Sequence, residues 1–139
     1  MSANILIVED EMMIAFDMEA TLEDLGHVVV GIAPDLETAM SIADEHSIDL
    51  ALVDMNLRDG QTGPEIGRRL CSRRKCAVLF VTANPRELGE GIAGAIGVVT
   101  KPANPEAVRT AVEYALNVSR GAVIAAPPPA LRLFSQHGG

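Results

Sequence analysis

The sequence is poor in aromatic residues, in cysteine and in basic charge, and each shortage excludes a class of protein. It has no tryptophan, one tyrosine and three phenylalanines among 139 residues, so its core must be built from aliphatic side chains. Two cysteines, Cys71 and Cys76, are too few for a disulfide framework and are not in a CxxC spacing. The net charge of −8 argues against direct binding of nucleic acid and against docking on anionic lipid.

Long apolar runs are also missing. No stretch reaches the roughly 18 apolar residues that a membrane-spanning helix needs, and no signal-peptide pattern opens the chain. A chain of 139 residues has room for one sizeable core but not for two ordinary domains. We therefore expect one cytoplasmic domain.

Short apolar runs alternate with helical patterns over most of the chain. This alternation predicts βαβ units, and hence an α/β fold with a doubly wound parallel sheet and helices on both faces. The predicted strands are residues 5–8, 28–33, 50–53, 77–81 and 96–100. The fourth helix should begin at Pro85, but Gly89, Gly91 and Gly94 interrupt it, so we expect it to be short, shifted or mobile.

Polar residues of different kinds end four of these runs. They are Glu9-Asp10 after the first run, Asp54 after the third, Thr82 at the end of the fourth, and Lys101-Pro102 after the fifth. The carboxyl ends of parallel strands lie along one edge of a sheet, where ligands bind in open α/β folds. The pattern therefore predicts a cation site beside a potential nucleophile. Taken singly, Asp54 could merely begin a turn, Asp10 could cap a helix and Lys101 could be solvated.

Together, in this order and in these strand contexts, the residues resemble the receiver domain of bacterial two-component response regulators. The resemblance covers about residues 2–119 and implies a five-stranded sheet of flavodoxin-like order 2-1-3-4-5. It implies that a sensor histidine kinase or a phosphotransfer protein phosphorylates Asp54, giving a mixed anhydride. It also implies a Mg²⁺ ion bound by oxygen ligands, which that cation prefers. The ligands would be Glu9, Asp10, Asp54 and the backbone carbonyl of Asn56.

The resemblance assigns further roles around the acceptor. Thr82, Ala83 and Lys101 would stabilise the phosphoryl group, and the Lys101–Pro102 peptide would be cis. The chain departs from the family pattern at Val98, where most receivers carry an aromatic residue that reports the state of the site. It departs again at Arg58, where a proline is usual. The loop 56–60 and the stretch 82–88 look closest to receivers of the alphaproteobacterial general-stress-response type.

We predict a stand-alone receiver, residues 1–119, that is not an enzyme and acts through an unknown downstream protein. It would work as a switch, a phosphate shuttle or a phosphate sink, with at most a weak homodimer. A receiver-like scaffold that is never phosphorylated is an alternative, because Val98 is atypical. A phosphatase with Asp54 as nucleophile is disfavoured because Asn56 replaces its second Asp. A flavin site is disfavoured because acidic residues follow the first strand. The Pro-rich tail, residues 120–139, is either disordered or a docking segment.

Overall fold

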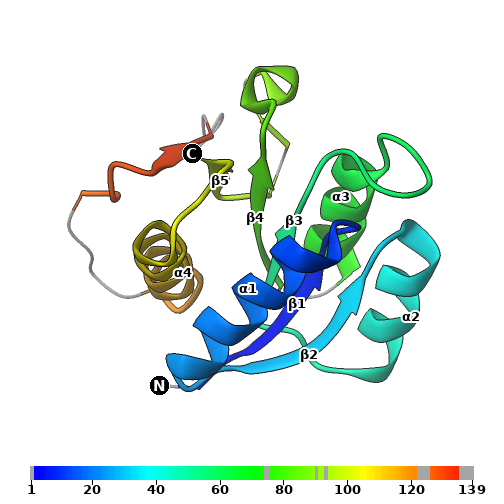
Figure 1. The fold of residues 1–139 in the computed structure, drawn as a ribbon, viewed down its shortest axis with the longest axis horizontal. Helices are drawn as coiled ribbons and strands as arrows, with labels where there is room; N and C mark the ends of the chain where they lie inside the picture. The colour runs from blue at the N-terminus through cyan, green and yellow to red at the C-terminus, as the bar shows by residue number, and fades with distance from the viewer. Residues whose placement is uncertain (1, 74–75, 90, 93, 122–125, 135–139) are drawn as a thin grey trace.

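The computed structural model describes residues 2–73, 76–89, 91–92, 94–121 and 126–134. Strands and helices alternate along the chain, which confirms the predicted α/β fold (Figure 1). The elements are β1 (Asn4–Val8), α1 (Met12–Asp24), β2 (Val28–Ala33), α2 (Leu36–Glu45), β3 (Leu50–Val53), α3 (Gly63–Arg73), β4 (Ala77–Thr82), the 3₁₀ helix η1 (Pro85–Leu88), β5 (Gly97–Thr100), α4 (Pro105–Ser119) and β6 (Leu131–Leu133).

The sheet has the order β2-β1-β3-β4-β5-β6. The first five of these strands are parallel, in the predicted order 2-1-3-4-5. The predicted count of five strands needs a correction, because β6 adds a sixth strand antiparallel to β5. The Pro-rich tail thus places a short strand on the sheet, and three residues are too few to give a strand signal in the sequence.

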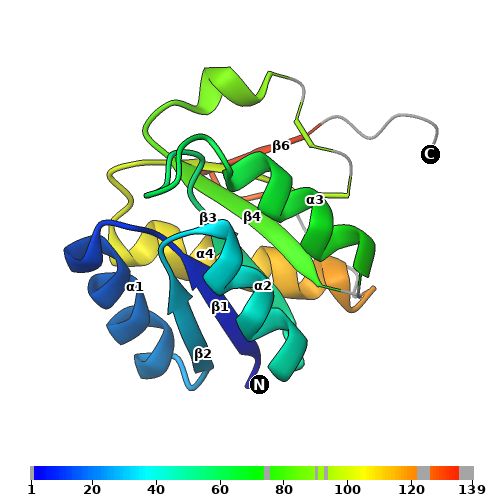
Figure 2. The same ribbon diagram turned by 90° about the vertical axis from the view of Figure 1, so that its right-hand side faces the viewer.

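Helices cover both faces of the sheet (Figures 1 and 2). Side chains of α1 and α4 pack on one face, and side chains of α2 and α3 pack on the other. Every residue of β3 and β4 is buried, as expected for strands covered on both sides. Two of the helices begin at capping side chains: Asp35 Oδ1 accepts the Thr38 N–H at 2.9 Å, and Asn104 Oδ1 accepts the Ala107 N–H at 2.8 Å.

The segment between β4 and β5 confirms that the fourth predicted helix is short. Among its described residues, the helical part is η1, a single 3₁₀ turn. Gly89, Gly91 and Gly94 all have positive φ, a backbone conformation that residues with a side chain rarely adopt. These glycines end the helix and turn the chain back toward β5.

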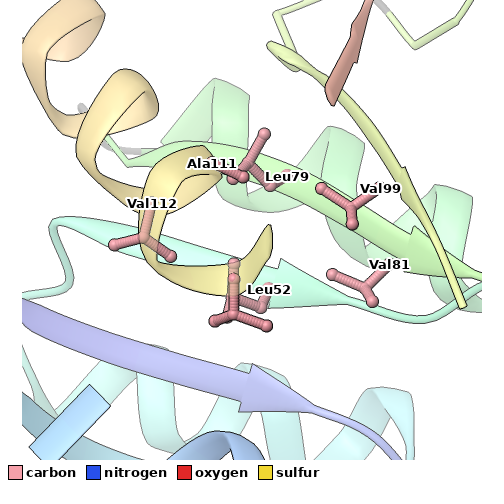
Figure 3. Close-up of a pocket in the computed structure, with 7 residues that line it drawn as sticks. Leu52, Leu79, Val81, Val99, Ala111 and Val112 are labelled. Carbon is pink, nitrogen blue, oxygen red and sulfur yellow. The ribbon is translucent and has the colours of Figure 1, made fainter. Parts of the chain in front are cut away.

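The interior leaves little unfilled space. Figure 3 shows a pocket between the sheet and α4 that is lined by apolar side chains only, among them Leu52, Val99 and Val112. Its volume is about 10 Å³, which is close to the minimum for one water molecule, and it offers no polar partner to hold one. We therefore assign this pocket to packing and not to a ligand. Among the described helices, none is long and apolar enough to cross a bilayer.

Candidate functional site

The ends of β1, β3, β4 and β5 meet at one edge of the sheet, as the strand register requires. Backbone hydrogen bonds continue the parallel pairing one residue past the strands. The Asp54 N–H donates to the Val8 carbonyl at 3.0 Å, and the Lys101 N–H donates to the Thr82 carbonyl at 2.9 Å. The backbone therefore fixes the positions of Asp54, Thr82 and Lys101 relative to one another.

Lys101 lies at the centre of a cluster of carboxylates. Its Nζ is 2.8 Å from Asp54 Oδ2, 2.5 Å from Glu9 Oε1 and 3.7 Å from Glu11 Oε2. Burial alone would lower the pKa of Lys101, but its contacts with Asp54 and Glu9 outweigh that effect and raise the pKa above its ordinary value. Lys101 is therefore a fixed positive charge beside the Asp54 carboxylate.

Glu9 is almost fully buried, with 1% of its surface exposed. Its Oε2 accepts the Glu11 N–H at 3.1 Å. Its Oε1 pairs with the Lys101 ammonium at 2.5 Å and accepts no further hydrogen bond from the described residues. Burial raises the pKa of Glu9 to about 7, since it disfavours the ionised form more than Lys101 favours it. A buried carboxylate oxygen whose partner is a single ammonium still has a lone pair with which it could bind a metal cation.

The carboxylate oxygens of Glu9, Glu11 and Asp54 all lie within 4.8 Å of one another. Such a set of oxygen ligands suits Mg²⁺, which needs one or two carboxylates and keeps several waters. Glu9 and Asp54 are in this group as expected, but the half-buried Asp10 is not in it. Glu11 was not among the predicted ligands, although the chain reads Glu9-Asp10-Glu11, because the family resemblance pointed only to the first two acidic residues. Asn56, whose carbonyl was the fourth predicted ligand, is exposed in the loop after β3.

The remaining predicted residues surround this cluster. Thr82 is buried, and its Oγ1 accepts the Asn84 N–H at 3.2 Å. Ala83 is exposed and presents only a methyl group. The Lys101–Pro102 peptide is cis, as expected.

Val98 is only 1% exposed and packs in the core cluster on the α2–α3 side of the sheet. The two aromatic side chains of that cluster are Phe80 and Phe134, whose ring centroids lie 6.1 Å apart. The region around the atypical residue therefore does contain aromatic rings, and one of them comes from the tail.

Gly63 is a second residue near Asp54 that the sequence pattern did not single out. It begins α3, and its N–H donates to the Met55 carbonyl at 3.0 Å. A Cβ at this position would lie 2.0 Å from the backbone oxygen of Asp54. Only glycine therefore allows α3 to approach the backbone of Asp54 so closely. A sequence shows a loop glycine here, but not the approach that requires it.

Arg58, the second departure from the family pattern, ties two loops together. Its guanidinium forms an ion pair with Asp35 at the start of α2, and the backbone N–H of Arg58 donates to the Pro34 carbonyl at 3.1 Å. The next residue, Asp59, accepts the Leu36 N–H at 3.0 Å. These contacts hold the loop that follows Asp54 without the usual proline.

Comparisons with known proteins agree with this geometry. The family model described as the response regulator receiver domain matches residues 5–113 of the chain. Among curated proteins, the chain is 38% identical over 119 residues to the phyllosphere-induced regulator PhyR of Methylorubrum extorquens, covering 84% of this chain and 44% of that protein. The chain spans about half the length of the curated relatives it matches.

Solved structures give the same result. The receiver domain of the Erythrobacter litoralis PhyR response regulator matches with a TM-score of 0.79 at 30% identity, covering 89% of this chain and 97% of that one. The Bartonella quintana PhyR, described as an anti-anti-sigma factor, matches with a TM-score of 0.75 at 33% identity, covering 87% of this chain and 50% of that one. The similarity to PhyR proteins agrees with the predicted resemblance to general-stress-response receivers.

Proposed function

Because the chain belongs to the response regulator receiver domain family, we propose that it is a phosphorylation-dependent protein-interaction switch whose phosphoacceptor is Asp54. One observation carries the proposal. The Asp54 carboxylate lies at the end of a buried strand, 2.8 Å from the Lys101 ammonium and within reach of two further carboxylates. That arrangement joins a nucleophile, a fixed positive charge and a cation site at one point.

The proposed reaction is transfer of a phosphoryl group from a phosphohistidine. A carboxylate oxygen of Asp54 attacks phosphorus, the new O–P bond forms as the P–N bond breaks, and the imidazole leaves with the electron pair of the P–N bond. Phosphoryl transfer depends chiefly on positioning and on neutralising charge on the phosphoryl oxygens. Lys101 is placed to provide part of that charge, since its Nζ already contacts Asp54 Oδ2.

The cation site would complete the charge balance. The side chains whose oxygens would hold Mg²⁺ are those of Glu9, Glu11 and Asp54. The Asn56 carbonyl and Asp10 stay predicted ligands, although the Asp10 carboxylate is not in this cluster. The ion would neutralise charge on the phosphoryl oxygens when bound. Glu9 Oε1 supports this assignment, because this buried oxygen has the Lys101 ammonium as its ion-pair partner and accepts no further hydrogen bond from the described residues, which leaves it able to bind a metal cation as well.

Thr82 and Ala83 would respond to the new phosphoryl group. The Thr82 hydroxyl, which accepts the Asn84 N–H at rest, can donate a hydrogen bond to a phosphoryl oxygen. We propose that it rotates toward the phosphoryl group and that the contact with Asn84 is lost. The small Ala83 side chain, which is exposed directly after β4, would leave room for the phosphoryl group. A rearrangement that begins at Thr82 would shift the population of the segment that follows β4.

An apolar surface on α1 supports docking of a protein donor. Met12, Met13 and Phe16 are 42%, 77% and 51% exposed at the start of the helix, directly after Glu11. Flexible methionines and an aromatic ring suit contact with an apolar helical surface. We infer that the kinase or phosphotransfer protein binds here. The two free cysteines, Cys71 and Cys76, suit the reducing conditions of the cytoplasm, which we propose as its location.

The alternatives have weaker support. A scaffold that is never phosphorylated would have no use for carboxylates of Glu9, Glu11 and Asp54 gathered within 4.8 Å of one another around one ammonium. A phosphatase needs a second acid near the nucleophile, and the chain has Asn56 in the place where that acid is expected. A phosphate shuttle or sink would use the same site, so it differs from a switch only in the downstream partner.

The test is the intact mass of the protein after incubation with acetyl phosphate. We expect the gain of one phosphoryl group that requires Mg²⁺ and disappears in Asp54→Asn. Glu45→Gln, a change at an exposed residue of α2, is the matched control and should retain the gain. A chain that gains no phosphoryl group with Mg²⁺, or gains one equally in Asp54→Asn, would exclude Asp54 as the acceptor.

A further inference from the structure

The structure carries an inference about the tail, and it rests on the proposed function. We propose that residues 131–134, here called the strap, lock η1 and the edge of β5 while Asp54 is unphosphorylated, and that phosphorylation releases them. The strap would then be the segment that moves when the switch is activated. Its release would expose the surface beneath it for binding by a partner protein. Figure 1 shows this segment as the red strand beside β5.

The strap closes an exposed edge of the sheet. β6 pairs with β5 through Leu131, Arg132 and Leu133, and the Phe134 N–H extends the pairing by donating to the Ile96 carbonyl at 3.0 Å. Unpaired strand edges attract strands of other chains, and proteins usually protect them. In this chain the tail provides the protection.

The strap is anchored in both layers of the core. Leu131 is 5% exposed and packs with the cluster on the α1–α4 side, whereas Phe134 is 4% exposed and packs with the cluster on the α2–α3 side. Leu133, on the same strand, is 40% exposed. Two buried anchors on opposite faces therefore hold a segment of four residues.

Two glycines make room for the strap. A Cβ at Gly97 would lie 2.3 Å from the Arg132 carbonyl oxygen, and a Cβ at Gly91 would lie 2.2 Å from the Phe134 ring. Any side chain at either position would collide with the docked segment. The surface thus fits an extended segment that carries an aromatic anchor, and the strap has that form.

The strap also contacts the segments next to Thr82. The Arg132 guanidinium donates to the carbonyls of Pro85 and Gly89, at 3.1 and 3.3 Å, and so binds η1 at its start and just past its end. The Phe134 ring packs against Phe80, which lies two residues before Thr82 in β4. The strap therefore touches the chain on both sides of Thr82.

These contacts connect Asp54 phosphorylation to the strap through Thr82 and η1, and they predict that phosphorylation weakens the docking of the strap. At rest the Thr82 hydroxyl accepts the N–H of Asn84, the residue before η1. If Thr82 turns to the phosphoryl group, that hydrogen bond is lost and the start of η1 is freed. The carbonyls that Arg132 binds then move, and the strap loses contacts. Phe134 thus takes over the reporting role of the aromatic residue that Val98 replaces.

The experiment measures hydrogen exchange of the amides of residues 131–134 in the full chain, together with the intact mass of the same samples. In the unphosphorylated protein we expect Phe134→Ala and Arg132→Ala each to raise this exchange at least tenfold. Leu133→Ala, an exposed change on the same strand, should leave it within twofold. Unchanged exchange in β1 and β3 shows that a variant is folded. If Phe134→Ala does not fold, Arg132→Ala still tests the inference, because it alters an exposed side chain.

Phosphorylation of the wild-type chain should raise exchange of residues 131–134 at least tenfold. A sample that has gained the phosphoryl group but shows unchanged exchange there would overturn the strap and leave the proposed function intact. A sample that gains no phosphoryl group overturns the proposed function, and phosphorylation-driven release with it. Unchanged exchange in both Arg132→Ala and Phe134→Ala would show that the strap is not held by these anchors, which also overturns the inference.

Discussion

Replacing Gly63 by alanine tests whether the approach of α3 positions Asp54. The added Cβ would lie 2.0 Å from the Asp54 carbonyl oxygen and 2.6 Å from the Met55 Cα. Ordinary contacts between nonbonded heavy atoms lie near 3.5 Å, so the two backbones must separate by about 1 Å or more. Because both sides of the collision are backbone, a side-chain rotation cannot relieve it.

The cost follows from this geometry. Overpacking of a dense interior costs about 1–3 kcal/mol, and a collision with backbone belongs near the upper end. The preference of about 1 kcal/mol for alanine over glycine holds in a helix interior, so at Gly63, the first residue of α3, it offsets only a small part of the loss. We therefore expect Gly63→Ala to lower the free energy of unfolding by about 2 kcal/mol. The separation of α3 from Asp54 should also slow phosphorylation of that carboxylate by acetyl phosphate.

Gly60→Ala is the matched control, because Gly60 lies in the same loop. Its φ is +109° and a Cβ there would meet nothing within 4 Å, so alanine adds backbone strain without a collision. That strain costs about 1–2 kcal/mol, a similar loss of stability. Urea unfolding and intact mass should therefore show two destabilised variants, of which only Gly63→Ala is phosphorylated slowly. Wild-type stability in Gly63→Ala, or equal phosphorylation of both variants, would refute the reasoning.

Three further predictions concern the cluster, the core and pH. Lys101→Met leaves the carboxylates of Asp54 and Glu9 without their ammonium partner. Urea unfolding should show that the free energy of unfolding falls by about 3 kcal/mol without metal and partly recovers in millimolar Mg²⁺. No recovery would count against the cation site. Val98→Phe overfills a position that is 1% exposed and should cost about 1–3 kcal/mol in the same assay, whereas a stable variant would reveal unfilled space. Burial lowers the pKa of His27, whose Nδ1 accepts a backbone N–H at 3.1 Å. The unfolded chain therefore binds this proton more readily, and stability should fall as pH drops below about 6.5. His27→Gln should show a smaller loss between pH 8 and pH 5, and an equal loss would contradict the assignment.

Much of the fold was predictable because its strands are buried on both faces. Continuous apolar runs such as residues 50–53 and 77–81 have the length of strands, and two of the helices, α2 and α4, begin at the capping residues Asp35 and Asn104. The sixth strand was not predictable in this way. Leu131-Arg132-Leu133 is too short to show a period, and its pairing depends on the glycine at position 97 of a distant strand.

The site was predictable where the chemistry follows directly from a strand end. Glu9, Asp54 and Lys101 meet as expected, because parallel strands in register must bring their next residues together. Glu11 and Gly63 were missed for a different reason. Their roles depend on loop geometry that the sequence does not show. Glu11 is held beside Glu9 by the hydrogen bond from its N–H, and Gly63 matters because α3 approaches the backbone of Asp54.

The shortage of aromatic residues also carries information about the tail. The predicted aliphatic core is present, yet two of the three phenylalanines, Phe80 and Phe134, are buried against each other. The third, Phe16, is 51% exposed on α1. A large ring buries more apolar surface than the valine at position 98 can, so an aromatic residue in the tail holds that segment far more strongly than a polar one would. Val98, which departs from the family pattern, and the tail, which seemed to lie outside the domain, are therefore packed together. The last parallel strand lacks an aromatic ring, and Phe134, the residue that follows β6, provides one.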